Sequence, residues 1–516
     1  MQHTETLVID LFAGPGGLGE GFASFKDENG NYPFKIGISV EKEASAHKTL
    51  TTRAFFRKIQ HLPGGLDSYF KYLKKELTRE ELFSAFSEEA KHAQKETLTK
   101  PCALGDDNEH IHTEIKKLVS DHQGPTVLIG GPPCQAYSLA GRSRNAGITG
   151  YTPENDDRNF LYEEYLNVLS IAKPDVFVME NVRGILSAKV NGSTIFPKIL
   201  EDLQNPGEVT GLTDVPGYKV YSLVVPSKDN SAPSYKKNSD FLIRSEQHGI
   251  PQARHRVILL GVRENIAQVP QILPKFEDTV SVMDAISDLP KLRSGFSKRA
   301  DNRNDWERVI SENAKTVKKL LSSKFDPSLV NGLDLQPFEG LSRKEVRREQ
   351  SNTPKLPPAL LKWITSNSPP LVINHETRGH MESDLLRYSY SAAYTQLNGG
   401  FSPKARDFPS KLAPTHQNWL SGSHADRFRT QAANRPSTTV TSHISKDGHY
   451  FIHYDPKQCR SLTIREAARL QTFPDNYFFE GNRTQQYVQV GNAVPPFLAN
   501  QVAKVVFTLL RKAVTG

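Results

Sequence analysis

Cysteine is scarce in this chain, and long apolar runs are lacking. Only Cys102, Cys134 and Cys459 occur, an odd number that is too small for a disulfide framework and has no paired metal-ligand spacing. No run approaches the ~18 apolar residues of a membrane span. The first residues, MQHTETLVIDLFAG, lack the basic and apolar regions of a signal peptide. These absences indicate a reducing compartment, and we expect the protein in the cytoplasm.

Excess charge is also small. The 65 Lys and Arg against 57 Asp and Glu leave a net charge of +8 over 516 residues, of which 37% are hydrophobic. This balance permits an anionic partner such as nucleic acid without demanding one, because it also serves solubility. The composition excludes global disorder, collagen and coiled coil. The length suggests about three domains, or one large domain with a smaller one.

Apolar segments of strand length alternate with amphipathic segments of helix length in the first half of the chain. Near-continuous apolar strands of this kind indicate a parallel sheet that is buried on both faces. The expected fold is therefore a doubly wound α/β domain. We expect its strands at LVIDLF from Leu7 and at residues 35–41, 126–131, 174–180 and 255–262, with a helix at 159–172.

Two stretches break the alternation. A charged, helix-rich segment at about 60–105 predicts a helical insertion with a solvated face. From about residue 264 the rhythm is lost and Pro, Ser, Asn and Arg become frequent, which indicates a second, irregular domain. Helices are expected at 461–473 and 497–513. The predicted organisation is a first domain at 1–263, a second at 264–483, and a segment at 484–516 that completes the first.

A glycine-rich turn follows the first strand. Gly14, Gly16 and Gly19 satisfy G-x-G-x-x-G, and Glu41 lies about twenty residues further on, as in a dinucleotide site. Asp10, at the end of the strand, would repel a pyrophosphate and favour a cationic ligand such as S-adenosylmethionine. Glycines that only let a helix pack closely on a strand are the alternative interpretation.

Three further residue types point to chemistry at strand ends. Cys134 lies in the polar loop GGPPCQAYS directly after a strand, a setting for a nucleophilic thiolate. Glu180 ends the next strand and is a candidate acid. Arg254 and Arg256, two residues apart, would place two guanidinium groups on one face for a carbonyl, a phosphate or a structural carboxylate. We expect the other cysteines to be buried hydrophobes.

The ordered motifs DLFAGPGGLGEGF, GGPPCQAYS, ENVRG, QHGIPQARHRV, RPSTTV and QVGNAVPP resemble those of the DNA (cytosine-5)-methyltransferases, above all the bacterial restriction-modification enzymes. The resemblance extends over residues 10–496. It implies a Rossmann-like methyltransferase domain that uses S-adenosylmethionine, and a target-recognition domain in the second, irregular region. It also implies a double-stranded DNA substrate and, as a functional partner, a cognate restriction endonuclease; we expect a monomer.

The resemblance also implies a mechanism. Cys134 would add to C6 of a flipped-out cytosine, and the activated ring would then take the methyl group at C5. Glu180 would hold N3 and N4 of the base, Arg256 would bind O2, and Arg254 would be a supporting basic residue. The implied cofactor residues are Asp10, Phe12, Gly14, Gly16, Gly17, Glu41, Asp106 (with Asp107 as its alternative), Pro133, Leu161, Asn492 and Ala493.

For DNA, the resemblance implies contacts by Gln135, Ser138, Arg435 and Thr438, and Arg427 and Arg429 are further candidates for phosphate contacts. A tRNA cytosine-5 methyltransferase of the same fold and a DNA-binding protein with an inactive methyltransferase domain are the two alternatives.

The segment at 442–455 predicts a hairpin around Asp447-Gly448. Its histidines, His443, His449 and His453, have no second ligand cluster, so no metal site is expected.

Overall fold

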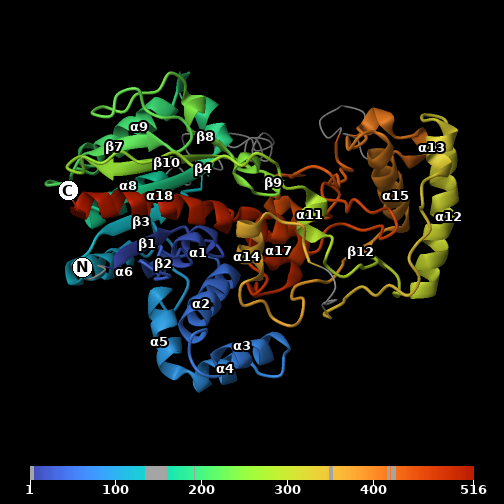
Figure 1. Cartoon of the computed structure of the whole chain (residues 1–516), viewed down its shortest axis with the longest axis horizontal. Helices are drawn as coiled ribbons and strands as arrows, with labels where there is room; N and C mark the ends of the chain where they lie inside the picture. Colours follow the sequence, from blue (N-terminus) through green and yellow to red (C-terminus); the bar gives the residue numbers. More distant parts are fainter. Residues whose placement is uncertain are drawn as a thin grey trace.

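The computed structural model describes residues 5–133, 160–190, 192–347, 353–414, 419 and 426–515. Cys134, Gln135 and Ser138 therefore lie outside the described residues. Figure 1 shows a lobe built on a β-sheet, a helical arm beside it, and a second lobe that contains α12 (Arg303–Leu321) and α15 (Glu382–Leu397).

A seven-stranded sheet forms the centre of the first lobe, with the strand order β2-β1-β3-β4-β10-β7 and β8 paired to β10. Strands β1 to β4 are parallel, as expected. The expectation of a parallel fifth strand was wrong, because β10 runs antiparallel to both β4 and β7. The strands are β1 (Thr6–Leu11), β2 (Phe34–Val40), β3 (Thr126–Gly130), β4 (Val176–Val182), β7 (Tyr218–Ser222), β8 (Leu242–Arg244) and β10 (His255–Arg263).

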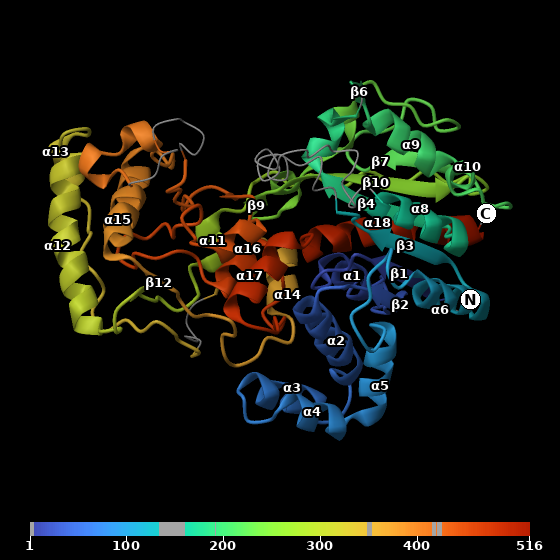
Figure 2. The ribbon, with the colours of Figure 1, turned by 180° about the vertical axis from the view of Figure 1, so that it is seen from behind.

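Helices cover both faces of this sheet, so the doubly wound α/β fold is confirmed. Side chains alternate along β1, so Val8 packs in one apolar cluster whereas Ile9 and Leu11 pack in the other. The first layer contains α1 (Gly17–Ala23) and α18 (Pro496–Thr515), which lie side by side in both views (Figures 1 and 2). The second contains α6 (Asn108–Asp121), α8 (Phe160–Ala172), α9 (Phe196–Gln204) and α10 (Pro206–Thr210).

The closing helix α18 returns the end of the chain to the first lobe. By length and mean hydropathy (1.4), the segment Arg483–Ala513 resembles a membrane span, but 67% of its most apolar window is buried in the fold. Its apolar side chains, including Leu498 and Val502, belong to the cluster that also contains Phe22 of α1. Helix α18 is therefore a core element of the first lobe.

The predicted helical insertion forms an arm on α2 (Ala44–Ile59), shown in blue in Figure 1. Phe55 of α2 stacks on Phe83 with ring centroids 4.3 Å apart. Where α5 (Ser87–Glu96) ends, Glu96 pairs with Arg57, and with Lys58 at 2.6 Å. These contacts tie the arm to α2 along its length. The helices of the arm are α3 (Gly65–Leu73), α4 (Arg79–Ala85) and α5 (Ser87–Glu96).

The region 264–483 divides into two parts. Trp306 and Tyr388 belong to an apolar cluster of the outer lobe, which is separate from the sheet. Val282, Leu360 and Leu470 instead share a cluster with the strands and α18. The outer helices are α12 (Arg303–Leu321), α13 (Pro327–Asn331) and α15 (Glu382–Leu397), and the inner ones are α11 (Val282–Ile286), α14 (Pro358–Thr365), α16 (Ile464–Leu470) and α17 (Arg483–Asn492).

Short strands complete the structure. The parallel pair of β9 and β13 joins the first lobe to the inner part of the later region, and β11 and β12 pair within the later region. The short strands are β5 (Lys189–Val190), β6 (Ser193–Thr194), β9 (Gln252–Ala253), β11 (Gly295–Phe296), β12 (Gly379–His380) and β13 (Ser437–Thr438).

The hairpin expected at residues 442–455 does not form. A 3-10 turn occupies Ser442–Ser445, and Ile452 pairs with Thr430 and with Ser461 instead of with the other half of the segment. The side chain of Asp447 accepts a hydrogen bond from the amide of His449 at 3.0 Å. The Asp-Gly pair therefore makes a local turn whose flanking residues find partners elsewhere.

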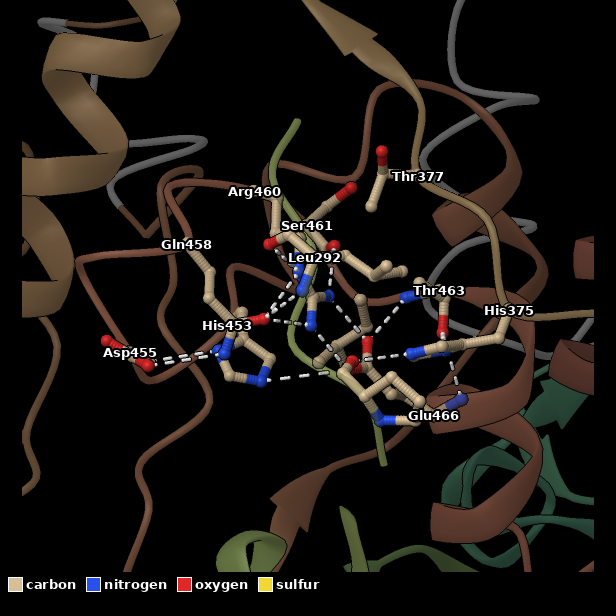
Figure 3. Close-up of polar contacts among 12 residues, drawn as sticks. Leu292, His375, Thr377, His453, Asp455, Gln458, Arg460, Ser461, Thr463 and Glu466 are labelled. Carbon is tan, nitrogen blue, oxygen red and sulfur yellow. Dashed lines mark hydrogen bonds and ion pairs between the residues drawn. The ribbon is translucent and has the colours of Figure 1, made fainter. Parts of the chain in front are cut away.

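A buried polar network surrounds the start of α16 (Figure 3). Arg460 donates two hydrogen bonds to Glu466, at 2.7 and 2.6 Å, and both side chains are 1% exposed. His453 Nε2 lies 3.7 Å from the Glu466 carboxylate. His375 donates from Nε2 to the carbonyl of Pro290 at 2.8 Å, and its Nδ1 lies 2.9 Å from the Thr463 hydroxyl. This network joins α16 to segments more than 80 residues away.

These histidines make the fold sensitive to acid. Burial lowers the pKa of both His375 and His453 to about 4, whereas an unfolded histidine titrates near ~6.5. Between these values the unfolded chain binds more protons, so stability is lost as the pH falls from about 6.5 towards 4. We expect denaturant unfolding at pH 5 to show a loss of roughly 2–4 kcal/mol relative to pH 7. Equal stability at both values would contradict neutral, buried histidines.

Candidate active site

A cavity of about 1130 Å³ lies where β1, β2, β3 and β4 end. The carboxyl ends of parallel strands are where α/β sheets bind their ligands. Of the residues expected in the site, Phe12, Gly14, Glu41, Pro133, Leu161, Glu180, Arg254, Arg256, Thr438 and Asn492 line this cavity.

The glycine loop and Glu41 form one wall of the cavity. The Glu41 carboxylate accepts hydrogen bonds from the amide of Gly14 at 2.8 Å and from the amide of Glu43 at 2.7 Å. Burial raises the pKa of Glu41. Phe12 and Gly14 have φ angles of 53° and 56°, and a side chain at Gly14 would meet no atom within 4 Å. The loop thus opens into the cavity at Gly14, with Glu41 held beside it.

The next glycines serve packing, which is the alternative that the sequence left open. A Cβ atom at Gly17 would lie 2.2 Å from the carbonyl oxygen of Val494, and one at Gly16 would lie 2.8 Å from Leu50. Neither glycine lines the cavity, and Ala493 is also outside the lining, although Asn492 is part of it. Gly17 lets the segment before α18 approach α1.

Asp10 does not lie in the cavity, so the expectation of a direct electrostatic effect on the ligand was wrong. Its side chain points under α1, where a Cβ atom at Gly19 would lie 2.5 Å from its carboxylate. Asp10 is 1% exposed, and burial raises its pKa well above the ordinary value. Because burial disfavours the charged form of this carboxyl, Asp10 exerts little pull on a cation in the cavity.

Glu180 and Arg256 form an ion pair in the cavity wall. Arg256 Nε lies 2.8 Å from Glu180 Oε1, and the two side chains are 15% and 14% exposed. The antiparallel pairing of β10 with β4 brings them together, since Arg256 lies opposite Val182. Gly131 allows the close approach, because a Cβ atom there would be 2.9 Å from Glu180 Oε2. A carboxylate and a guanidinium are thus presented together.

Arg254 is a buried cation that joins three segments at the cavity. It is 2% exposed, and its Nη1 donates to the carbonyl oxygens of Val440 and Gly491 at 2.8 and 3.3 Å. Its Nε has no hydrogen-bond partner among the described residues. Burial and the nearby Arg256 lower its pKa. Arg254 therefore holds the cavity walls together and places positive charge there.

The end of the helical insertion closes another side of the cavity. Cys102, Ala103 and Leu104 line it, and the amide of Cys102 donates to the carbonyl of Glu41 at 3.0 Å. Neither Asp106 nor Asp107 is in the lining, contrary to the expected adenine contact. Asp106 is exposed, and Asp107 instead accepts a hydrogen bond from the amide of Ala103 at 2.8 Å.

The later region supplies the opposite wall through the motif RPSTTV. Its strand β13 pairs with β9, which directly precedes Arg254. The Thr439 hydroxyl donates to the carbonyl of Ala253 at 2.8 Å. Thr438 lines the cavity, whereas Arg435 lies outside the lining and stacks on Phe401 at 3.9 Å. Thr439 of the same motif and Arg429, a predicted phosphate contact, also line the cavity. Nothing in the single sequence predicts the further lining residues Thr441, Lys446, Tyr450 and Phe451.

The histidines at residues 442–455 do not form one cluster. His449 contacts the Tyr388 hydroxyl at 2.8 Å in the outer lobe, whereas His453 lies beside Glu466. Over residues 5–133, 160–190, 192–347, 353–414, 419 and 426–515, no group of three or more His, Cys, Asp or Glu side chains could hold a metal ion.

The residues present suit a nucleoside. Phe12, Leu104 and Leu161 provide apolar walls, and the Glu41 carboxylate can accept hydrogen bonds from hydroxyl groups. The open space at Gly14 leaves room next to the backbone. Fold and cavity together define a Rossmann-like methyltransferase, the class that takes its methyl group from S-adenosylmethionine.

The comparison with known proteins confirms this class and gives the family. The family model "C-5 cytosine-specific DNA methylase" matches residues 74–508, and the chain belongs to this family. It is therefore a DNA (cytosine-5)-methyltransferase, as the motifs predicted.

Individual proteins similar to this chain support the family assignment. The chain is 32% identical to the type II methyltransferase M.Bpa9945I of Bacillus paralicheniformis, over 97% of this chain and 98% of that protein. It is 27% identical to the type II methyltransferase M1.HphI of Haemophilus parahaemolyticus, over 97% and 86%. A crystal structure from E. coli of a prophage-encoded protein, described as a DNA modification methyltransferase, has the same fold, with a TM-score of 0.54, 18% identity, and coverage of 98% and 100%.

Proposed function

We propose that this protein methylates C5 of a cytosine that is flipped out of a specific double-stranded DNA sequence, through a covalent bond between Cys134 and C6. The observation that carries the proposal is the Glu180–Arg256 pair at 2.8 Å, which shares one cavity with Glu41. Pro133, the residue before Cys134, lines the same cavity. The base-binding and cofactor-binding groups thus face one space.

The residues divide the chemistry among them. Cytosine C5 is a weak nucleophile, and addition of the Cys134 thiolate to C6 makes the ring an electron-rich enamine. Glu180 accepts a hydrogen bond from N4 and gives a proton to N3, which removes the negative charge that develops on the ring during this addition, while Arg256 donates to O2. After transfer, loss of the C5 proton expels Cys134 and restores the aromatic ring. Arg254 keeps this wall in place and adds positive charge.

S-adenosylmethionine supplies, when bound, an electrophilic methyl group. Phe12, Gly14, Leu161 and Asn492 would surround it, and Glu41 would bind the ribose hydroxyls. Gly16, Gly17 and Ala493 support the loop by packing, and Asp10 supports it from below α1.

The DNA would lie between the two lobes. We assign the catalytic domain to residues 1–263 with 484–516, and the target-recognition domain to 264–483. A cytosine stacked in a duplex hides C6, so the base must leave the helix, at a cost of a few kcal/mol. Gln135, Ser138, Arg435 and Thr438 are the proposed DNA contacts. We propose that the enzyme works as a monomer in the cytoplasm, at the nucleoid, and protects DNA from a cognate restriction endonuclease, in keeping with its type II relatives.

The test uses S-adenosylmethionine with a labelled methyl group, offered with duplex DNA or with tRNA. We expect label only in the DNA, recovered as 5-methylcytosine at one repeated sequence after bisulfite sequencing. Label in tRNA alone would assign the enzyme to RNA. Absence of label in both, with DNA binding retained, would indicate an inactive binding protein.

A further inference from the structure

Tyr477 contacts the glycine loop without lining the cavity. Its side chain is fully buried, and its hydroxyl donates a hydrogen bond to the carbonyl of Pro15. Pro15 itself lines the cavity. A Cβ atom at Gly16 would lie 2.9 Å from the Tyr477 hydroxyl, so the hydroxyl packs directly under the turn. The loop is thus held by Glu41 on one side, through Gly14 at 2.8 Å, and by Tyr477 on the other.

The ring of Tyr477 is itself fixed. The Arg53 guanidinium lies 4.6 Å from its centroid and 4.4 Å from that of Phe56. Arg53 also donates to Glu20 of α1, at 2.9 Å, and to the side chain of Asn476, at 2.8 Å. These partners are all buried, so the ring of Tyr477 is packed on groups that are themselves fixed by hydrogen bonds.

Side chains of α16 bind the turn that carries Tyr477. Arg465 donates to the carbonyl oxygens of Pro474 and Tyr477 at 3.0 and 2.6 Å. Arg469 pairs with Asp475 at 2.6 Å. The same short helix begins at the Arg460–Glu466 network, which also binds segments of the later region (Figure 3). A continuous set of buried contacts therefore runs from the base of the later region to the glycine loop.

We propose that Tyr477 is a positioning residue of the cofactor site. Its hydroxyl holds the Pro15 carbonyl, and so keeps the loop in the shape that places Gly14 against Glu41 for binding S-adenosylmethionine. The inference rests on the proposed function in one respect, the identity of this ligand. Tyr477 does not line the cavity, and it lies far along the chain from the glycine loop.

Tyr477→Phe tests it, because this change removes the hydroxyl and leaves the ring and its contact with Arg53. We expect the Kd for S-adenosylmethionine, measured by calorimetry without DNA, to rise about 3- to 10-fold, the effect of one lost hydrogen bond. We expect kcat at saturating S-adenosylmethionine to stay within about twofold of wild type, because loosened binding raises KM.

Tyr218→Phe is the matched control. Tyr218 is 1% exposed, and its hydroxyl also donates to a proline carbonyl, that of Pro174, at 3.0 Å, but it does not line the cavity. Both variants lose one buried hydrogen bond, so their unfolding midpoints measure the common structural cost. Weakened binding in Tyr477→Phe alone supports the proposal. Equal Kd values in both variants, raised or unchanged, would overturn it. A wild-type protein that binds no S-adenosylmethionine would instead refute the proposed function.

Discussion

Replacing Cys134 with serine is expected to reduce methyl transfer to less than about one thousandth of the wild-type rate. A serine hydroxyl at neutral pH offers almost no alkoxide, whereas the thiolate is the form of cysteine that attacks carbon. The Kd for S-adenosylmethionine is expected to change less than about twofold, since the groups proposed to bind it, above all Glu41, remain. Transfer of labelled methyl groups to duplex DNA measures the rate, and calorimetry measures the Kd.

Cys459→Ser is the control for this loss. Cys459 is 2% exposed in the outer lobe, and its thiol donates to the carbonyl of Leu385 at 3.1 Å, a bond that serine can make. We expect this variant to methylate at the wild-type rate. If Cys134→Ser also retained a tenth or more of the rate, another group would have to be the nucleophile.

A trapping experiment tests the covalent bond itself. In a duplex with 5-fluorocytosine at the target position, fluorine replaces the C5 proton that must leave before Cys134 can be expelled. Wild type and Cys459→Ser should remain bonded to this DNA after denaturation, in the presence of S-adenosylmethionine, whereas Cys134→Ser should not. A bonded complex with Cys134→Ser would contradict the assignment.

The sheet could be predicted from the sequence because most of its strands are buried on both faces, which leaves apolar runs such as LVIDLF. The direction of β10 could not, since an apolar run looks the same in either direction. The pairing of Ile452 with Thr430 and Ser461 could not be predicted either. Asp447-Gly448 is compatible with a hairpin turn, but tertiary partners decide whether its flanks pair with each other.

The candidate site divides in the same way. Glu41, Glu180 and Arg256 could be predicted because strand ends and short motifs place them, and they line one cavity. Asp10 could not, since only the packing of α1 shows that its carboxyl is covered. The predicted adenine contact of Asp106 was wrong for a different reason. Residues that follow a helical insertion are not positioned by a strand, so the sequence does not show which of them reach the cavity. Ala103 and its neighbours line the wall instead.

Glu466→Gln is expected to cost about 3–5 kcal/mol of stability, the effect of leaving one partner of a buried ion pair uncompensated. Burial raises the pKa of the Glu466 carboxyl, but Arg460 more than offsets this, so the pKa lies well below its ordinary value and the group is ionised at neutral pH. Glutamine keeps the shape and can still accept the amide hydrogen bond of Thr463 that starts α16. The loss of stability therefore measures what the negative charge opposite Arg460 contributes to the free energy of unfolding.

Glu81→Gln is the control, because Glu81 has the same place in a capping box, with Thr78 at the start of α4, but is exposed to solvent. Denaturant unfolding should show a much smaller change in stability for this variant than for Glu466→Gln. Since α16 also holds the turn of Tyr477, Glu466→Gln should further weaken the binding of S-adenosylmethionine, and Glu81→Gln should not. Equal stability losses in the two variants would mean that the Arg460–Glu466 pair contributes no more than an ordinary helix cap.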